Sequence, residues 1–296
     1  MKNRFACLVI GLLQLFIFII YIQIYWLSNQ RKRADDGFQL AQSMNSKCGR
    51  HTFYENREFP TESLYFDSRY NTMFCVVPKA GSRFVARSLA NSGSYVFKPP
   101  KSLSNLKKVT FFREPLERLL SAYKDKLKNC QKSNHCKNVS GFAKAVANYA
   151  ILNKKTSQLS NQISDIVPQN ISFSDFVSYI IYIYQSKSGS FYSAEIPYYI
   201  WMHWSPQVVY CHVCLVKYDF VILFEEMEQL IRDGFPKLGL HYDFHFRATT
   251  PNITELKQYY AQVSSRDLFY LGKVMYATDY KFLPYSFDEF VKRIGR

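Results

Sequence analysis

Hydrophobic residues along the chain form one long run near the amino terminus and then short clusters separated by polar segments. The long run, residues 5–27, contains 23 residues and no charged side chain. As a helix it would extend roughly 34 Å, enough to cross a hydrocarbon core about 30 Å thick. It ends in Tyr25, Trp26 and Leu27, bulky residues typical of a membrane interface rather than of a cleavage site. We therefore predict an uncleaved transmembrane signal anchor over residues 5–27.

Polar residues dominate the next segment, residues 28–60, which lacks a regular hydrophobic period. This pattern predicts a short stem without a packed core, followed by a single domain over residues 61–296. The 296-residue chain is 48% hydrophobic and 17% aromatic, which is sufficient for one large domain with a full core. The sequence contains no internal repeat, so solenoid and propeller folds are excluded.

Three short hydrophobic clusters in this domain each precede a helical pattern. Residues 73–77 predict a buried strand, and residues 83–90 then place apolar side chains on one helical face. A strand over 108–112 precedes a helix over 116–127, and a strand over 220–224 precedes an acidic helix start. Strands that alternate with helices predict an α/β fold, here a three-layer, P-loop-like domain with a central, mostly parallel sheet.

Basic residues outnumber acidic ones by 38 to 23, which gives a formal net charge of +15. This excess favours a polyanionic partner: nucleic acid, an anionic membrane or an acidic glycan. The basic residues on the two sides of the anchor are nearly balanced and do not fix its orientation. Glycosylation sequons at Asn138, Asn170 and Asn252 indicate a lumenal domain, and therefore a cytoplasmic tail of residues 1–4. A lumenal domain meets no nucleic acid, so a nucleic-acid partner is not expected.

Six cysteines lie outside the predicted anchor: Cys48, Cys75, Cys130, Cys136, Cys211 and Cys214. An even number of cysteines in an oxidising compartment predicts disulfides. The Cys-His-Val-Cys segment at 211–214 also has the spacing of half a zinc site or of a redox pair, but no second such pair completes a zinc tetrad. We therefore predict no metal site, and we assign Cys75, which lies on the first predicted strand, to the core.

Two strand-to-helix turns carry the candidate chemistry, because ligands of such sheets bind beyond the carboxyl ends of the strands. The turn at 78–83 offers a glycine, a hydroxyl, two cations and the free N–H groups of a helix start, the components of an anion site. In the second turn, Arg113 and Ser121 are eight positions apart, slightly more than two helical turns, so both can contact one phosphate. Arg118, between them, either binds phosphate as well or pairs with Glu114.

These two segments, VVPKAG at 76–81 and REPLERLLSAYKDK at 113–126, resemble the Golgi carbohydrate sulfotransferases, most closely the group containing the chondroitin 4-O-sulfotransferases. Segments at 203–207, 211–214 and 218–220 recur in that family in the same order. The resemblance implies that the first turn binds the 5'-phosphosulfate of 3'-phosphoadenosine 5'-phosphosulfate and that the second binds its 3'-phosphate. It implies no metal requirement.

The resemblance also assigns roles to single residues. The implied donor-binding residues are Lys79, Ala80, Gly81, Ser82, Arg83, Arg113 and Ser121. Lys79 would also act in catalysis by stabilising charge on the leaving nucleotide, and His203 would be the general base, with Glu195 as the alternative base. Arg83 occupies a position where the family usually carries a hydroxyl residue, so Ser82 would have to supply the hydroxyl.

The resemblance predicts an enzyme that transfers a sulfonate group to a sugar hydroxyl, with the 4-hydroxyl of N-acetylgalactosamine in chondroitin as the expected acceptor. An acidic glycan or proteoglycan also fits the positive charge. Two lysine clusters are candidates for its groove: Lys98, Lys101, Lys107 and Lys108, or Lys124, Lys126 and Lys128. We expect a single-pass type II protein of the Golgi membrane with a lumenal catalytic domain. The alternative, suggested by Arg83, is an inactive lumenal glycan-binding protein with the same fold.

Overall fold

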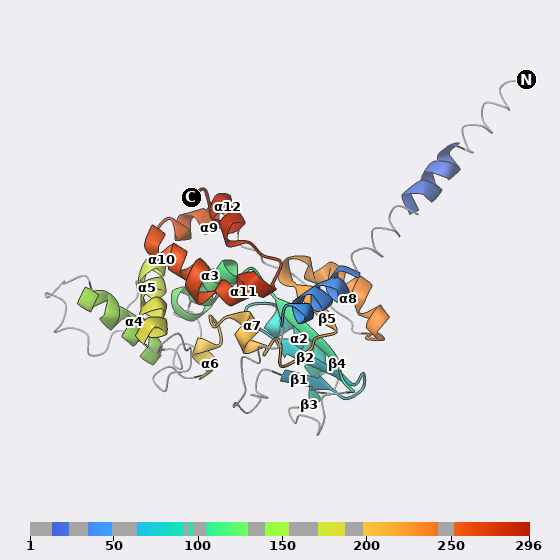
Figure 1. Ribbon diagram of the computed structural model, residues 1–296, viewed down its shortest axis with the longest axis horizontal. Helices are drawn as coiled ribbons and strands as arrows, with labels where there is room; N and C mark the ends of the chain where they lie inside the picture. The colour runs from blue at the N-terminus through green and yellow to red at the C-terminus, as the bar shows by residue number, and fades with distance from the viewer. Residues whose placement is uncertain are drawn as a thin grey trace, which may run out of the picture.

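A five-stranded sheet with the strand order β3-β1-β2-β4-β5 organises the domain (Figure 1). The computed structural model describes residues 14–23, 35–48, 64–91, 95–96, 105–129, 140–153, 171–186, 198–241 and 252–296. Its strands are β1 (Leu64–Asp67), β2 (Thr72–Val76), β3 (Tyr95–Val96), β4 (Lys107–Phe112) and β5 (Phe220–Leu223). β2, β4 and β5 run parallel to one another, and β1 pairs antiparallel with β2 and with β3. The three predicted strands are confirmed, and they form the parallel centre of the sheet.

Side chains of the sheet alternate between two hydrophobic clusters on its opposite faces. On β2, Met73 and Cys75 belong to one cluster, whereas Phe74 and Val76 belong to the other. The cluster around Phe74 is completed by α2 (Ser82–Asn91) and α8 (Met227–Gly234), and the cluster around Met73 by most of the other helices. The predicted α/β fold with a central, mostly parallel sheet is therefore confirmed.

The helices that contribute to the cluster around Met73 lie mainly in the carboxyl-terminal half of the chain. They are α3 (Pro115–Tyr123), α4 (Ser140–Asn153), α5 (Phe173–Ser186), α6 (Tyr198–Trp201), α7 (Gln207–Tyr210), α9 (Ile253–Tyr260), α10 (Ser265–Tyr270), α11 (Ala277–Phe282) and α12 (Phe287–Ile294). The helix predicted over 116–127 is divided, because α3 passes into a π-helical turn, η2 (Lys124–Lys128). Likewise, a 3₁₀ turn, η6 (Phe224–Glu226), precedes α8.

A helix over residues 35–46 packs against the domain, although it belongs to the predicted stem. Ala41 and Met44 are buried in the cluster around Met73, and the rings of Phe38 and Phe220 lie 4.8 Å apart. The prediction of a stem without a packed core is therefore wrong for this segment. Its apolar residues follow a helical spacing of three, but they are outnumbered by polar neighbours.

Residues 14–23 of the predicted anchor are helical. Among the residues that the structure describes, no helix combines the length and the hydropathy needed to cross a membrane. The remaining anchor residues, 5–13 and 24–27, lie outside the described part of the chain.

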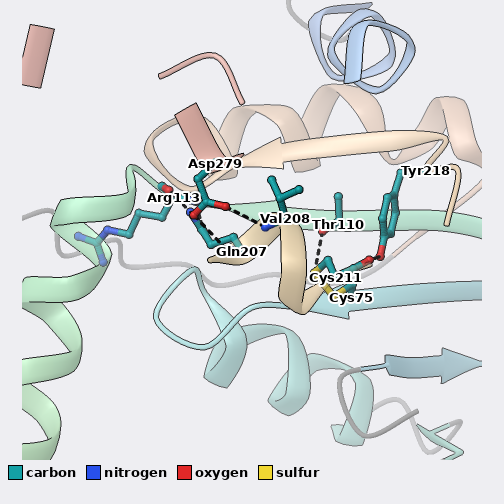
Figure 2. The surroundings of a disulfide bond; sticks show 8 residues. All are labelled: Cys75, Thr110, Arg113, Gln207, Val208, Cys211, Tyr218 and Asp279. Carbon is teal, nitrogen blue, oxygen red and sulfur yellow. Dashed lines mark hydrogen bonds between the residues drawn. A yellow bond between two sulfur atoms is a disulfide. The ribbon is translucent and has the colours of Figure 1, made fainter. Parts of the chain in front are cut away.

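Two disulfides join the segment 211–214 to distant parts of the chain. Cys75 of β2 is bonded to Cys211 (Figure 2). Cys48 is bonded to Cys214. The predicted disulfides are confirmed, and Cys75 is a disulfide cysteine as well as a core residue. Because the two cysteines of the CxxC segment have different partners, this segment forms neither a redox pair nor half of a zinc site. Cys130 and Cys136 lie outside the described residues.

Replacing Cys48 and Cys214 together by serine should lower the free energy of unfolding by about 3–5 kcal/mol. The bond closes a loop with a sequence separation of 166, so its loss mainly increases the entropy of the unfolded chain. Thermal unfolding of the variant and of the wild type, with and without reductant, measures the effect. Alkylation of Cys211 or Cys214 in the folded, unreduced protein would contradict the assigned pairing.

Candidate active site

Helix α3 is the buried centre of the site. It begins at Pro115, whose missing N–H and fixed φ suit a first helical position, and Glu114 caps it by accepting a hydrogen bond from the N–H of Glu117 at 2.6 Å. Eight of its nine residues are buried, and the exception is Ser121. Ser121 lines a cavity of about 460 Å³. The helix therefore exposes to the cavity the one hydroxyl that the sequence predicted for it.

This cavity brings the two predicted turns together. Its lining includes Lys79, Gly81, Ser82 and Arg83 from the first turn, Arg113 and Ser121 from the second, and His203 from a later segment. Ala80, the remaining predicted donor-binding residue, is fully buried in the turn and does not line the cavity. Six of the seven predicted donor-binding residues, and both predicted catalytic residues, thus share one cavity.

The first turn has an unusual backbone. Lys79 has a φ of 71° and Gly81 a φ of 91°, both in the left-handed region. A Cβ at Gly81 would also lie 2.5 Å from the Cε of Met227, but this methyl group ends a flexible side chain, so the requirement for glycine is mainly conformational. The carbonyl of Gly81 then accepts the N–H groups of Phe84 and Val85, which starts α2 immediately after the turn. Left-handed backbone at a non-glycine residue such as Lys79 is typical of functional sites.

Asp125 forms ion pairs with three cations at the edge of the cavity. Its carboxylate lies 2.5 Å from Nζ of Lys79, 3.0 Å from Nη2 of Arg83 and 3.4 Å from Nζ of Lys126. Burial alone would raise the pKa of Asp125, but the hydrogen bond and charge of Lys79 lower it to about 2. Burial lowers the pKa of Lys79 to about 8, against the opposing effect of Asp125. At neutral pH Lys79 and Asp125 are therefore both charged.

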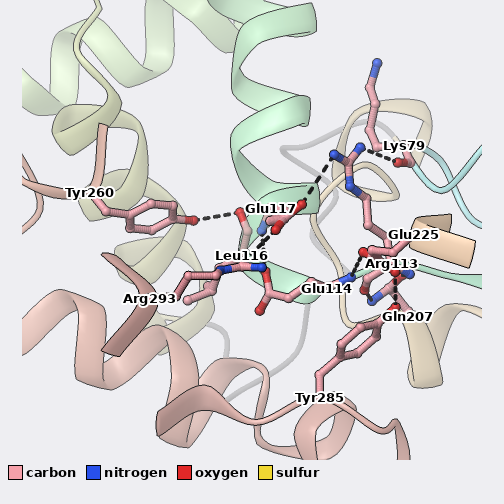
Figure 3. A network of polar contacts seen from close by, with 10 residues as sticks. All are labelled: Lys79, Arg113, Glu114, Leu116, Glu117, Gln207, Glu225, Tyr260, Tyr285 and Arg293. Carbon is pink, nitrogen blue, oxygen red and sulfur yellow. Dashed lines mark hydrogen bonds and ion pairs between the residues drawn. The ribbon is translucent and has the colours of Figure 1, made fainter. Parts of the chain in front are cut away.

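Arg113 is held by its backbone as well as by its side chain (Figure 3). Its N–H donates to Oε1 of Gln207 at 2.9 Å, and its carbonyl accepts Nε2 of Gln207 at 2.6 Å. The guanidinium donates to the carbonyl of Lys79 at 3.2 Å, lies 4.3 Å from the ring centre of Phe224 and pairs with Glu117 at 3.7 Å. Two of its buried nitrogens, Nε and Nη2, have no hydrogen-bond partner in the described part of the chain. Nη2 faces the carboxylate of Glu117, so an anion that binds here would compete with Glu117 for this nitrogen.

Gln207 is in turn fixed by Asp279, from α11 (Figure 2). The fully buried carboxylate of Asp279 accepts the N–H of Gln207 at 3.0 Å and that of Val208 at 2.9 Å, which caps the amino terminus of α7. The role of Asp279 was not predicted from the sequence. It connects the end of the chain to the second turn.

Arg118 has a structural role that differs from both predicted ones. It is fully buried and donates to the carbonyls of Pro78, His203 and Ser205, so it joins the first turn to the segment that carries His203. Glu114, its predicted partner, instead accepts a hydrogen bond from the hydroxyl of Tyr280 at 2.6 Å. Burial raises the pKa of Glu114 to about 8, which favours the protonated carboxyl there.

His203 is 7% exposed, and its Nδ1 lies 3.3 Å from the carbonyl of Ile200. This contact favours a proton on Nδ1, which leaves the lone pair of Nε2 available. Burial, followed by the charges of Lys126 and Lys79, lowers the pKa of His203 to about 3. The imidazole is therefore neutral at physiological pH. Glu195, the alternative base, lies outside the described residues.

Only part of the predicted lysine groove reaches the cavity. Lys126 lines it, whereas Lys124 pairs with Glu255 at 2.5 Å and Lys128 contacts Tyr259. Lys107 and Lys108 are not among the lining residues. Lys98 and Lys101 lie outside the described part of the chain.

The chain matches the family described as "Sulfotransferase family" over residues 62–286, more than half of its length. It is 25% identical over 302 residues to mouse carbohydrate sulfotransferase 8, covering 86% of this chain and 64% of that protein. It is 25% identical to human carbohydrate sulfotransferase 9, over 64% of this chain and 44% of that protein. It is 24% identical to rat carbohydrate sulfotransferase 11, over 64% of this chain and 50% of that protein. No solved structure matches.

The chain thus spans just under two thirds of the length of the first of these relatives and about half of the others. The match to the family nevertheless includes both turns of the cavity, Gln207 and Asp279. On this evidence the chain belongs to the sulfotransferase family, and the relatives named above are carbohydrate sulfotransferases.

Proposed function

We propose that the protein transfers a sulfonate group from 3'-phosphoadenosine 5'-phosphosulfate to a hydroxyl group of a glycan. The observation that carries the proposal is the single cavity in which Lys79 and Ser82 of one turn meet Arg113 and Ser121 of the other. Two separate sets of cations and hydroxyls suit a ligand with an anionic group at each end. In this proposal Lys79, Gly81, Ser82 and Arg83 bind the phosphosulfate, and Arg113 and Ser121 bind the 3'-phosphate.

Sulfonate transfer is a displacement in which the attacking and leaving oxygens are in line with sulfur, as in phosphoryl transfer. The sugar oxygen forms a bond to sulfur while the bond between sulfur and the bridging phosphate oxygen breaks. The electron pair of that bond remains on the departing 3'-phosphoadenosine 5'-phosphate. Lys79 stabilises this negative charge, because a protonated amine beside the bridging oxygen interacts more strongly as charge develops. It must first exchange its contact with Asp125 for a contact with the donor.

The sugar hydroxyl loses its proton in this step, and His203 is the proposed acceptor. A neutral imidazole whose Nδ1 holds the proton has an unprotonated Nε2, which suits this role. The low pKa of His203 in the ligand-free protein makes it a weak base there, partly because Lys79 and Lys126 are nearby. The negative charge of a bound phosphosulfate offsets these lysines and raises the basicity of His203 when it is needed.

For the acceptor we propose the 4-hydroxyl of N-acetylgalactosamine in chondroitin. The supporting observations are the net charge of +15 and the resemblance of the two turns to chondroitin 4-O-sulfotransferases. The sequons and the two disulfides support a lumenal domain, and we propose a type II protein of the Golgi membrane.

A glycan-binding protein without catalysis is the second candidate, and Arg83 is the residue that favours it. Its side chain is 76% exposed and pairs with Asp125, so it leaves room for Ser82 at the cavity but supplies no hydroxyl. The two candidates differ in donor binding. A thermal shift caused by 3'-phosphoadenosine 5'-phosphate favours the enzyme, whereas glycan binding without such a shift favours the alternative.

Lys79→Ala should lower kcat for transfer of labelled sulfate to desulfated chondroitin by about 100- to 1000-fold, because it removes the charge that stabilises the leaving group. Arg113→Ala should instead weaken binding of 3'-phosphoadenosine 5'-phosphate by roughly 10- to 100-fold. Arg87→Ala, an exposed cation on α2 that does not line the cavity, is the control. Ser121→Ala tests the same phosphate contact with a smaller structural change. Full transfer activity in folded Lys79→Ala protein would refute the proposed site.

The rate constant kcat/KM should fall as the pH rises through about 8, because Lys79 loses its proton there. Asp125→Asn removes a negative charge that raises the pKa of Lys79, so this fall should move to lower pH. Asp288→Asn, which removes an exposed partner of Lys273, is the matched control and should leave the profile unchanged. Identical alkaline limbs in wild type and Asp125→Asn would exclude Lys79 as the titrating group.

His203→Gln should lower kcat by about 100- to 10,000-fold while the affinity for 3'-phosphoadenosine 5'-phosphate changes little. Glutamine keeps hydrogen-bonding capacity but cannot accept the proton. Single-turnover kinetics and calorimetric titration separate the two effects. A loss confined to donor affinity would assign His203 to binding rather than to proton transfer.

A further inference from the structure

A second cavity, of about 410 Å³, lies between α4, α5 and α10. It shares no lining residue with the candidate active site. Figure 1 shows α4 and α5 at one end of the domain, away from the sheet, and both α4 and α10 contact α5. The proposed transfer reaction uses none of its residues. Its side chains therefore need a separate explanation.

Tyrosine rings form one part of this cavity. Tyr149, Tyr182 and Tyr270 line it, one from each helix. The rings of Tyr149 and Tyr182 lie 4.9 Å apart with an interplanar angle of 31°, and Tyr182 is 48% exposed. Partly exposed, tilted rings of this kind offer a flat apolar surface with a hydroxyl at its edge. The apolar C–H face of a sugar ring is complementary to such a surface.

Polar groups form the other part. Gln185 and Arg266 line the cavity from α5 and α10, and both are exposed. Asp267, which accepts a hydrogen bond from Ser178 at 3.3 Å, and Asp175 add two carboxylates. Amide, guanidinium and carboxylate groups together both donate and accept hydrogen bonds, as sugar hydroxyls require. With two carboxylates and one cation, the lining disfavours an acidic ligand, in contrast to the positive charge of the whole chain.

We propose that the cavity between α4, α5 and α10 binds an uncharged sugar unit of a glycan. The sugar ring packs against the Tyr149 and Tyr182 rings, and its hydroxyls bond to Gln185, Arg266 and Asp267. Two sources can supply this unit: the acceptor chain itself, at some distance from the reacting sugar, or a separate glycan. The first source rests on the proposed function, whereas the binding itself does not.

Binding is tested with the full chain, purified in a detergent without a sugar head group. The probes are the methyl glycosides of N-acetylgalactosamine, which is uncharged, and of glucuronic acid, titrated by ligand-observed NMR. We expect the uncharged glycoside to bind more tightly, and Tyr182→Ala to raise its Kd by about five- to tenfold. Because the two cavities share no residue, saturating 3'-phosphoadenosine 5'-phosphate should leave this Kd unchanged.

Phe269→Ala is the matched control, since Phe269 is a 59% exposed aromatic residue of α10 that does not line the cavity. Gln185→Ala is a second cavity variant, at an exposed position where misfolding is not expected. The proposal is overturned if Tyr182→Ala and Gln185→Ala both bind the uncharged glycoside like the wild type. It is also overturned if the glucuronide binds more tightly in a Tyr182-dependent manner.

Transfer kinetics distinguish the two sources of the sugar. If the acceptor supplies it, Tyr182→Ala raises KM for long acceptors but leaves kcat, and KM for the shortest acceptor, unchanged. An unchanged KM together with weakened glycoside binding assigns the cavity to a separate glycan. If the wild type transfers no sulfonate at all, the proposed function fails, and the NMR titrations alone decide the cavity.

Discussion

The two hydrogen bonds between the amide of Gln207 and the backbone of Arg113 set the geometry on which the candidate site depends. They fix the position at which β4 ends and α3 begins, and thus the direction of the Arg113 side chain. Asp279 orients Gln207 from the other side. All three residues are buried, so a lost partner would leave polar groups without hydrogen bonds and without water. Residues far apart in the sequence therefore act as one unit.

The site holds its charged groups in two different ways, one in the interior and one at the edge of the cavity. Arg118 is fully buried, and within the described residues its partners are three backbone carbonyls rather than a carboxylate. Such a group is costly to desolvate, and its benefit is positional, because it joins the first turn to the His203 segment. Around Asp125 the opposite solution is found, with three cations sharing one carboxylate at the edge of the cavity. Buried groups such as Arg118 thus set the shape of the site, whereas the ion pairs of Asp125 at the edge of the cavity can be exchanged for contacts with a ligand.

The sequence was sufficient to predict those parts of the site that depend on local pattern. Alternating strands and helices located both turns, and the spacing of Arg113 and Ser121 placed them on one cavity. The contact of Lys79 with Asp125 was out of reach, since it joins residues of two different elements and Asp125 is surrounded by lysines that suggest an exposed helix. The role of Arg118 was misjudged for a related reason. Helical spacing suggested Glu114, whereas the fold supplied carbonyls from two remote segments.

The pairing of Cys48 with Cys214 and of Cys75 with Cys211 also bears on the order of events during synthesis. The sequence separations are 166 and 136, so both amino-terminal cysteines emerge from the ribosome long before either partner. During that interval the native partners, Cys211 and Cys214, have not yet been translated. Oxidation at this stage would join cysteines that are not paired in the folded protein. Correct oxidation must wait until residues 211–214 pack beside Cys75 and Cys48, which makes thiol isomerisation a determinant of yield.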